Sequence, residues 1–275
     1  MTSNPAQSNA PPEDSWRIGA AYDPYVGRWS RLVALKFLDR LAVPSGSRWL
    51  DVGCGTAALT HAILQTAAPQ TVLGIDAAEG FIAHARANTD DGRAAFKVGD
   101  AQGLPVESAS FDAVVSGLML NFVPQPAQAV GEMVRAARPH GLVAAYVWDY
   151  AGKMQFMRHF WNAAVALDPA AADLDEGKRF PLCRPEPLAD LFRGAGLTGV
   201  EVWPIDIWTT FTDFDDYWNP FLGGQGPAPG YAMSLSEERR ALLSQRIRLA
   251  LPYALDGSIP LVARAWSVSG VRRNS

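Results

Sequence analysis

The chain has 275 residues, of which 48% are hydrophobic and 19% are charged. This composition excludes a disordered chain and is typical of one large domain, or of one domain with a substantial insertion. The formal net charge of −4 gives no positive field for a polyanion, so we expect a small-molecule partner and no nucleic acid.

The cysteines and the apolar runs indicate the compartment. Cys54 and Cys183 lie far apart and match neither a disulfide framework nor a CxxC motif, which suits a reducing cytoplasm. No apolar run approaches the roughly 18 residues needed to span a bilayer, and residues 1–15 lack the basic and apolar parts of a secretory signal. We therefore expect a cytoplasmic protein with no membrane partner. A homodimer is compatible with this composition.

The N-terminal region divides into an arm and a helix. Residues 1–15 are rich in Pro, Asn and Ser and predict a flexible arm. Apolar side chains then recur at helical spacing until Pro44 and Gly46, which predicts a helix over about 25–42. We assign residues 16–46 to an N-terminal helical lid. The recurring apolar residues are Trp29, Val33, Phe37 and Leu41.

Strands and helices alternate through residues 47–149. Such alternation is typical of βαβ units, and the unbroken hydrophobicity of the strands indicates a parallel sheet covered on both faces. The predicted strands are 47–52, 71–75, 94–98, 111–116 and 142–148, and the predicted helices are 56–66, 79–88 and 126–137.

The alternation loosens after Asp149. Seventeen of the 28 aromatic residues lie in 148–275, which favours an apolar or aromatic acceptor under a cap, although many of these rings must be core. Ser234 and Glu237 form a capping-box pair that predicts a helix to about Leu251. The other predicted elements are helices at 153–167 and 185–194, a strand at 199–205, an aromatic segment at 213–222, a loop at 223–230 and a last strand at 261–268.

The most informative motif is a glycine turn. The first predicted strand runs into Gly53-Cys54-Gly55-Thr56, where the glycines let a ligand approach the backbone and the following helix presents unpaired N–H groups. Asp76 ends the second strand 21 residues after Gly55, where a carboxylate accepts hydrogen bonds from ribose hydroxyls. The spacing predicts a ribose-bearing cofactor.

Two further carboxylates bear on which cofactor this is. A negative charge at Asp51, two residues before the first glycine, disfavours a pyrophosphate but suits a cationic or amino-bearing ligand. Asp100 closes the third strand at the same edge. These acids argue against a phosphate-rich cofactor. An NAD(P)-dependent oxidoreductase, which shares the glycine turn and Asp76, and a non-enzymatic binding module remain alternatives.

With these motifs the sequence resembles the class I S-adenosylmethionine-dependent methyltransferases, in the small-molecule branch called methyltransferase domain type 11. The resemblance covers about residues 22–148 and implies an α/β, Rossmann-like, seven-stranded and mostly parallel sheet with helices on both faces, an antiparallel last strand and helical cap insertions. It makes 47–149 the cofactor-binding core and 150–275 the part that completes the sheet and caps the substrate. The matching stretches are LDVGCGT at 50–56, GIDAAEGFIAHAR at 74–86, VGDAQGLP at 98–105 and FDAVVSGLMLNFV at 111–123.

The resemblance also implies S-adenosyl-L-methionine as cofactor. The glycine turn would hold its methionine portion, Asp76 its ribose, and Asp100 with Ala101 its adenine. In the lid, Tyr25 and Trp29 would offer aromatic faces to the sulfonium, and Arg28 or Arg31 would meet a carboxylate. The candidate cofactor-binding residues are Tyr25, Trp29, Asp51, Gly53, Cys54, Gly55, Thr56, Asp76, Ala77, Asp100, Ala101, Ser116 and Leu118.

Some positions depart from the family pattern. Ala57 replaces a glycine, which one methyl group tolerates if φ stays negative there. Arg138-Pro139-His140-Gly141 stands where the family usually has RPGG. Asn121-Phe122 replaces histidines found in many relatives, so no catalytic residue is assigned and no metal is expected. The expected reaction is methyl transfer to a small, apolar or aromatic metabolite.

Overall fold

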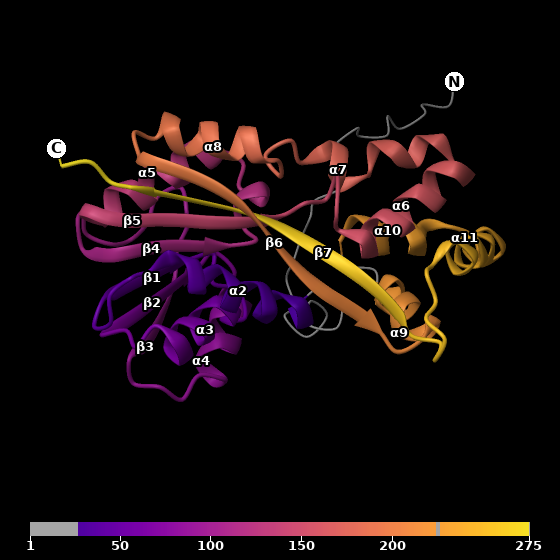
Figure 1. Ribbon diagram of the computed structural model, residues 1–275, viewed down its shortest axis with the longest axis horizontal. Helices are drawn as coiled ribbons and strands as arrows, with labels where there is room; N and C mark the ends of the chain where they lie inside the picture. Colours follow the sequence, from indigo (N-terminus) through magenta and orange to yellow (C-terminus); the bar gives the residue numbers. More distant parts are fainter. Residues whose placement is uncertain (1–26, 224–225, 275) are drawn as a thin grey trace, which may run out of the picture.

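The computed structural model describes residues 27–223 and 226–274 (Figure 1). The predicted arm at 1–15, the first part of the predicted lid and Tyr25 lie outside this range. The lid helix itself is α2, Arg28–Leu41. It buries the predicted apolar stripe, because Trp29, Val33, Phe37 and Leu41 are each at most 9% exposed.

The described residues form one seven-stranded sheet in the order β3-β2-β1-β4-β5-β7-β6. Only β7 runs antiparallel to its two neighbours, β5 and β6, among these strands. The predicted fold class is therefore confirmed. The strands are β1 Arg48–Val52, β2 Thr71–Asp76, β3 Ala94–Val98, β4 Phe111–Gly117, β5 Ala137–Trp148, β6 Thr198–Phe211 and β7 Ile259–Val271.

Helices cover both faces of the sheet, as expected for strands that are apolar on both sides (Figure 1). One layer contains α2, α3 (Ala58–Thr66) and α4 (Glu79–Ala87), with α2 packed on α3. The other layer contains α5 (Pro126–Ala136) and α8 (Pro185–Gly194), which pack together. The central strands β1, β4 and β5 are almost wholly buried between the layers.

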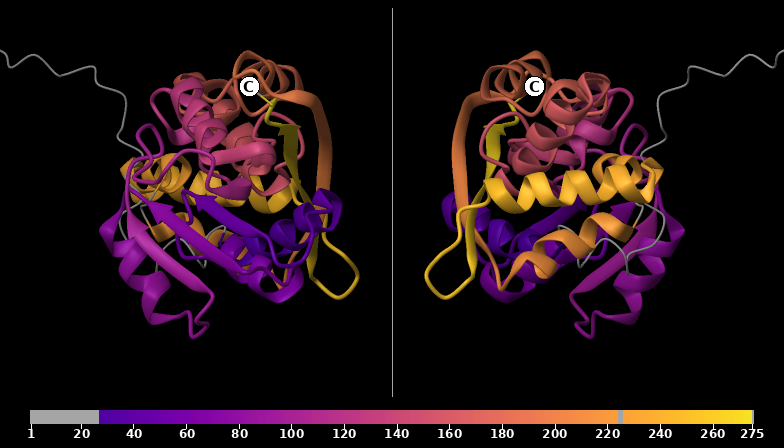
Figure 2. Two further views of the ribbon diagram at one scale, coloured as in Figure 1. Left: turned by 90° about the vertical axis from the view of Figure 1, so that its left-hand side faces the viewer. Right: turned by 90° about the vertical axis from the view of Figure 1, so that its right-hand side faces the viewer.

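The last two strands are much longer than predicted and extend beyond the sheet. β5 pairs with β7 only as far as Trp148 and Ala265, whereas the β6–β7 ladder continues to Phe211 and Ile259. The extended ladder carries a helical cap at one end of the molecule, seen from two sides in Figure 2. The cap helices are α6 Gln155–Leu167, α9 Phe214–Trp218, η4 Asn219–Gly223, α10 Pro227–Ser234 and α11 Glu237–Ala250.

An aromatic core fills this cap. Its rings lie 4.5–6.3 Å apart between centroids and are at most 8% exposed. Most of the aromatic excess in the second half of the chain is thus packing, whereas Trp208 is 68% exposed on the edge strand β6. The members of the core are Phe156, Phe160, Trp161, Phe211, Phe214, Tyr217, Trp218, Phe221 and Tyr231.

The predicted boundaries differ from the structure in the cap. The predicted loop at 223–230 contains the start of α10, because Pro227 takes the first helical position, where a missing N–H costs nothing. The predicted cap at Ser234 is wrong: α11 begins at Glu237, and Ser236 accepts the hydrogen bond from the N–H of Arg239. Ser234 instead bonds the carbonyl of Tyr231. Two short elements, η3 Pro169–Asp173 and α7 Glu176–Arg179, were not predicted.

The condition under which Ala57 would replace a glycine without strain, a negative φ, is not met. Ala57 has φ +70° and is fully buried where the turn enters α3. His140, in the other stretch that departs from the glycines of the family, has φ +61°. Both side chains therefore stand in a left-handed conformation that favours glycine.

A buried acid joins α7 to the cap. Glu176 is 3% exposed and accepts a hydrogen bond from the indole N–H of Trp161 on α6. The neighbouring Asp175 pairs with Arg158 of α6. Burial raises the pKa of Glu176 to about 8, so this carboxyl group is mostly protonated at neutral pH.

Glu176→Gln should change how stability depends on pH. The pKa of Glu176 is near 4.5 in the unfolded chain and about 8 in the folded protein, so folding takes up a proton between these two pH values. The free energy of unfolding therefore falls as pH rises through this window, by about 1 kcal/mol per pH unit from this group. Glutamine can still accept from Trp161 but binds no proton. Urea unfolding from pH 5 to 8 should show the variant gaining stability relative to the unaltered protein as pH rises; parallel curves would contradict this.

Ala57→Gly should stabilise the protein. Glycine adopts φ +70° without the Cβ clash, and the relief should raise the free energy of unfolding by about 0.5–1 kcal/mol, even after the loss of one buried methyl group. Ala62→Gly, at a buried position inside α3, is the matched control and should lower it by about 1 kcal/mol. Equal losses in both variants would show that Ala57 is unstrained.

Candidate functional site

The carboxyl ends of β1, β2 and β3 place the predicted acids along one edge of the sheet. Because these strands are parallel neighbours, the glycine turn after β1, Asp76 at the end of β2 and Asp100 after β3 follow one another along this edge. Such an edge is where open α/β sheets bind ligands. The structure thus brings together residues that lie up to 49 positions apart in the sequence.

The glycine turn is held open by backbone hydrogen bonds. The N–H groups of Gly53 and Cys54 donate to the carbonyl of Ile75, at 2.7 and 3.0 Å. Gly53 and Gly55 both have positive φ, and a Cβ on Gly53 would lie 2.4 Å from Cγ of Met119. A Cβ on Gly55 would meet nothing within 4 Å, so the turn faces open space at that residue.

Asp51 lies fully buried beneath the turn. Its Oδ2 accepts a hydrogen bond of 2.7 Å from the hydroxyl of Thr60, whereas its Oδ1 has no partner among the described residues. Burial raises the pKa of Asp51 to about 7, with a smaller contribution from the Asp76 carboxylate. A buried oxygen without a donor costs free energy, and a cationic or amino-bearing ligand would satisfy it.

Asp76 is tied to the turn and remains partly exposed. Its Oδ2 accepts from the N–H of Gly55 and its Oδ1 from that of Ala78, both at 2.9 Å. Burial raises its pKa, against the effect of these two bonds. Each oxygen keeps a second lone pair, so the carboxylate retains acceptor capacity for hydroxyl groups.

The remaining predicted site residues differ in exposure. Asp100 is exposed and its Oδ1 accepts from the N–H of Gln102 at 2.8 Å. Ser116 is fully buried, and Leu118, 9% exposed, has φ +60°, an uncommon conformation for leucine at the end of β4. Cys54 is buried and burial raises its thiol pKa, so it packs rather than reacts. Thr56 and Ala101 are partly buried and Ala77 is exposed.

At the start of α2, Trp29 is packed rather than free. It is 9% exposed, its ring lies 5.7 Å from that of Phe211, and the Arg28 guanidinium lies 4.5 Å from its centroid. Its indole N–H is buried without a partner among the described residues. This arrangement links α2 to β6 and the cap.

A group of three aromatic rings stands at the ends of β4 and β5, which sequence reasoning did not find. Phe180, just after α7, contacts Phe122 at 5.2 Å and Tyr150 at 5.6 Å. The short helix α7 packs on the backbone of Tyr150 and Ala151 through Gly177. No local sequence pattern predicts this contact, because Phe180 lies 30 residues after Tyr150 in the sequence.

Asp149, directly after β5, closes the turn that follows this strand. Its carboxylate oxygens accept from the N–H groups of Gly152 and Lys153, at 3.0 and 2.9 Å. A Cβ on Gly152 would lie 2.5 Å from Oδ2 of Asp149. Its position at the end of β5 is therefore explained by the turn that it closes.

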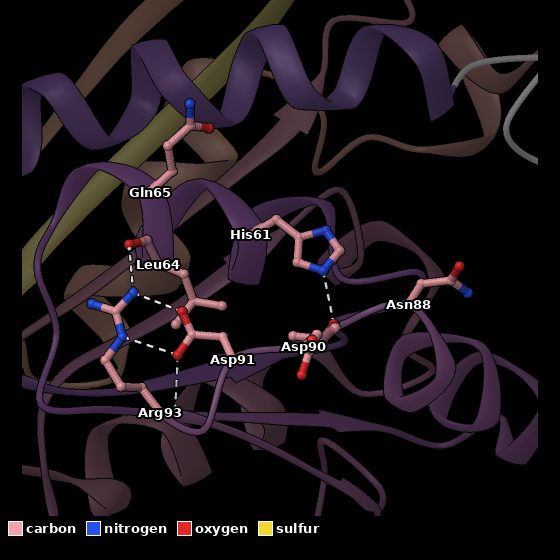
Figure 3. Close-up of a pocket in the computed structure, with 8 residues that line it drawn as sticks. His61, Leu64, Gln65, Asn88, Asp90, Asp91 and Arg93 are labelled. Atoms are coloured by element: carbon pink, nitrogen blue, oxygen red, sulfur yellow. Dashed lines mark hydrogen bonds and ion pairs between the residues drawn. The ribbon is translucent and has the colours of Figure 1, made fainter.

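A polar depression of about 340 Å³ lies elsewhere (Figure 3). It is lined by His61 and by residues of the segment that enters β3, so it lies at the opposite, amino edge of the sheet. Its groups satisfy one another: Arg93 pairs with Asp91, and the His61 ring bonds Thr89 at 2.8 Å (Figure 3). This depression is not part of the glycine-turn site.

Residues 27–223 and 226–274 include no group of three or more His, Cys, Asp or Glu that would hold a metal ion. None of their helices is both long and apolar enough to cross a bilayer.

Comparison with known proteins agrees with this geometry. The methyltransferase domain family matches residues 50–145, which contain the glycine turn, Asp76 and Asp100. The Haemonchus contortus phosphoethanolamine N-methyltransferase 2, in a complex with S-adenosyl-L-methionine, shares the fold with a TM-score of 0.59 at 18% identity, over 93% of this chain and 57% of that one.

Curated relatives extend the match in sequence. The malonyl-acyl-carrier-protein O-methyltransferase of Hahella chejuensis is 34% identical over 34% of this chain, and a 37.1 kDa transposon protein of Streptomyces fradiae is 34% identical over 38%. The chain spans about a third of the length of these two relatives, 33% and 31%. The demethylmenaquinone methyltransferase of Roseiflexus sp. strain RS-1 is 32% identical over 58% of this chain and 71% of its own length. This chain belongs to the class I S-adenosylmethionine-dependent methyltransferases.

Proposed function

We propose that this protein transfers the methyl group of S-adenosyl-L-methionine to a small, apolar or aromatic acceptor. One observation carries the choice of cofactor: the fully buried Asp51, whose Oδ1 has no partner in the part of the chain that the structure describes, lies beneath an open glycine turn beside Asp76. The amino group of the methionine portion would satisfy that oxygen, and Asp76 would accept from the ribose hydroxyls.

The same acids argue against the alternative of an NAD(P)-dependent oxidoreductase. A pyrophosphate at the glycine turn would lie close to the carboxyl groups of Asp51 and Asp76, and Asp100 follows the next strand. At short range in a partly buried site, such repulsion amounts to several kcal/mol. A ligand with a sulfonium and an ammonium group is attracted instead.

Methyl transfer from a sulfonium requires few catalytic groups from the protein. S-adenosylmethionine supplies an electrophilic methyl group on a sulfonium that is a good leaving group. The acceptor nucleophile forms the new bond to carbon as the carbon–sulfur bond breaks, and the electron pair stays on sulfur. The chain aligns the two partners through the glycine turn and Asp76 and excludes water with the cap. No catalytic base is assigned, because Asn121 and Phe122 stand after β4 where many relatives carry histidines.

Two observations support the class of acceptor. A relative that this chain covers over 71% of its length, from Roseiflexus sp. strain RS-1, is by its name a methyltransferase of demethylmenaquinone. The rings of Phe122, Tyr150 and Phe180 gather at the ends of β4 and β5, next to the glycine-turn edge. Aromatic rings in this position favour a flat apolar acceptor by stacking or edge contacts.

Calorimetric titration tests the cofactor. We expect the protein to bind S-adenosylmethionine and S-adenosylhomocysteine and not to bind NADH. Incubation with aromatic acceptors should then release S-adenosylhomocysteine and add the mass of one methyl group to an acceptor. Tight NADH binding without S-adenosylmethionine binding would contradict the proposal. Cofactor binding with no turnover across a broad acceptor panel would favour the non-enzymatic module.

Trp29→Ala should weaken the binding of S-adenosylmethionine by about 1 kcal/mol or more if the indole faces the sulfonium. S-adenosylhomocysteine lacks the positive charge, so its affinity should fall less, and Trp29→Phe should retain most of the binding of both. Titrations with the two ligands, with circular dichroism to confirm folding, measure this difference. Unchanged or equal affinities would leave Trp29 as a packing residue against Phe211.

A further inference from the structure

We propose that the side-chain amide of Asn121 binds an oxygen atom of the methyl acceptor, an assignment that rests on the proposed function. It narrows the acceptor to flat apolar rings that carry a carbonyl or hydroxyl oxygen. Asn121 lies in the short helix η2, Leu120–Phe122, which follows the carboxyl end of β4. Because β4 lies between β1 and β5 in the sheet, η2 lies at the same edge as the glycine turn.

The backbone turn that contains Asn121 joins the glycine turn to the aromatic rings at the strand ends. A Cβ on Gly53 would overlap the side chain of Met119, so Met119 packs against the glycine turn. Three residues later, the ring of Phe122 lies 5.2 Å from that of Phe180. The N–H of Phe122 donates to the carbonyl of Met119 at 2.9 Å, which closes one tight turn. Asn121 therefore lies between the proposed cofactor site and the rings proposed for the acceptor.

The amide nitrogen of Asn121 lacks a hydrogen-bond acceptor. Its Nδ2 is buried and donates to no atom of the described residues. A buried donor without a partner costs free energy, and such groups are rare in folded proteins. A carboxamide does not titrate at neutral pH, so the cost is removed only by an acceptor. An oxygen of a bound ligand would supply that acceptor.

The surroundings of Asn121 differ from those of other buried, unpaired polar groups. Arg28 and Arg158 also keep an unpaired buried nitrogen, but each already forms an ion pair with an aspartate. Asn121 forms no such pair and is partly exposed at the strand ends, where a ligand can reach it. Several other unpaired groups belong to strand residues that are at most 5% exposed, namely Trp49, Ser116, Trp148, Trp203, Thr209 and Ser267.

A carboxamide in this place contributes specificity and orientation. It is neutral at neutral pH, so it holds an oxygen but does not remove a proton from the acceptor. Aromatic contacts recognise the flat body of a ring, whereas the hydrogen bond distinguishes a ring that carries oxygen from a hydrocarbon ring. By fixing that oxygen, Asn121 also determines which edge of the acceptor faces the methyl group.

Two ligands with the same carbon skeleton isolate the predicted hydrogen bond. The carbonyl oxygens of 2-methyl-1,4-naphthoquinone accept hydrogen bonds, whereas 2-methylnaphthalene carries no oxygen. Calorimetric titration with saturating S-adenosylhomocysteine measures both affinities without turnover. Asn121→Leu should weaken the binding of the quinone about tenfold and should not weaken that of the hydrocarbon. Asn121→Asp, which keeps the shape but replaces the donor with a carboxylate, should weaken the quinone at least as much.

Gln125→Leu is the matched control. It removes an exposed carboxamide from the same connection between β4 and α5, and it should leave both affinities within twofold. If Asn121→Leu weakens both ligands equally, or leaves the affinity for the quinone unchanged, the assignment is wrong.

Urea unfolding gives a second readout that needs no ligand. Because Nδ2 of Asn121 has no partner to lose among the described residues, Asn121→Leu should not lower the urea midpoint. A lowered midpoint would show that the amide is used within the protein, and it would overturn the assignment.

The titrations also distinguish failure of this assignment from failure of the proposed function. If the unaltered protein does not bind S-adenosylhomocysteine, the proposed function itself fails. If it binds S-adenosylhomocysteine but neither naphthalene derivative, the acceptor class is wrong and the role of Asn121 with it, whereas the cofactor assignment stands.

Discussion

The parallel pairing of β1 with β2 and β4 is the constraint on which the rest of this protein depends. Neighbouring parallel strands have their carboxyl ends at the same edge of the sheet. The residues that follow each strand therefore lie along this edge, although a helical crossover separates consecutive strands in the sequence. The glycine turn, Asp76 and the strained Leu118 reach this edge from three different strands. A slip of one residue in any of these strands would turn its side chains to the opposite face and dismantle the site.

Two buried carboxyl groups have similarly raised pKa values but different surroundings. Asp51 and Glu176 are both almost fully buried, and burial raises the pKa of Asp51 to about 7 and that of Glu176 to about 8. Glu176 accepts from the Trp161 indole inside the cap, where nothing suggests a ligand. Oδ1 of Asp51 has no partner among the described residues and lies beneath an open turn, beside a second acid. Similar pKa shifts thus occur in two different surroundings, a satisfied packing contact and an open, polar strand end.

The aromatic residues of the second half have a structural use that composition could not reveal. Within residues 27–223 and 226–274, no other strand pairs with the distal part of the β6–β7 ladder, and helices cover its inner face. Nine rings do this in the cap, with Phe211 at the end of β6 joining that cluster to Trp29 of α2. The cap is thereby joined to α2, while the rings of Phe122, Tyr150 and Phe180 form a separate group at the ends of β4 and β5.

The sequence by itself determined the sheet of the core and the three acids at its edge, because unbroken apolar strands, a glycine turn and the spacing from Gly55 to Asp76 are local or regular features. It did not determine the left-handed conformation of Ala57, the start of α11 after Ser236, or the helix at Pro227. The packing of Trp29 on Phe211 and the contact of Phe122 with Phe180 join segments 182 and 58 residues apart, which only tertiary folding brings together.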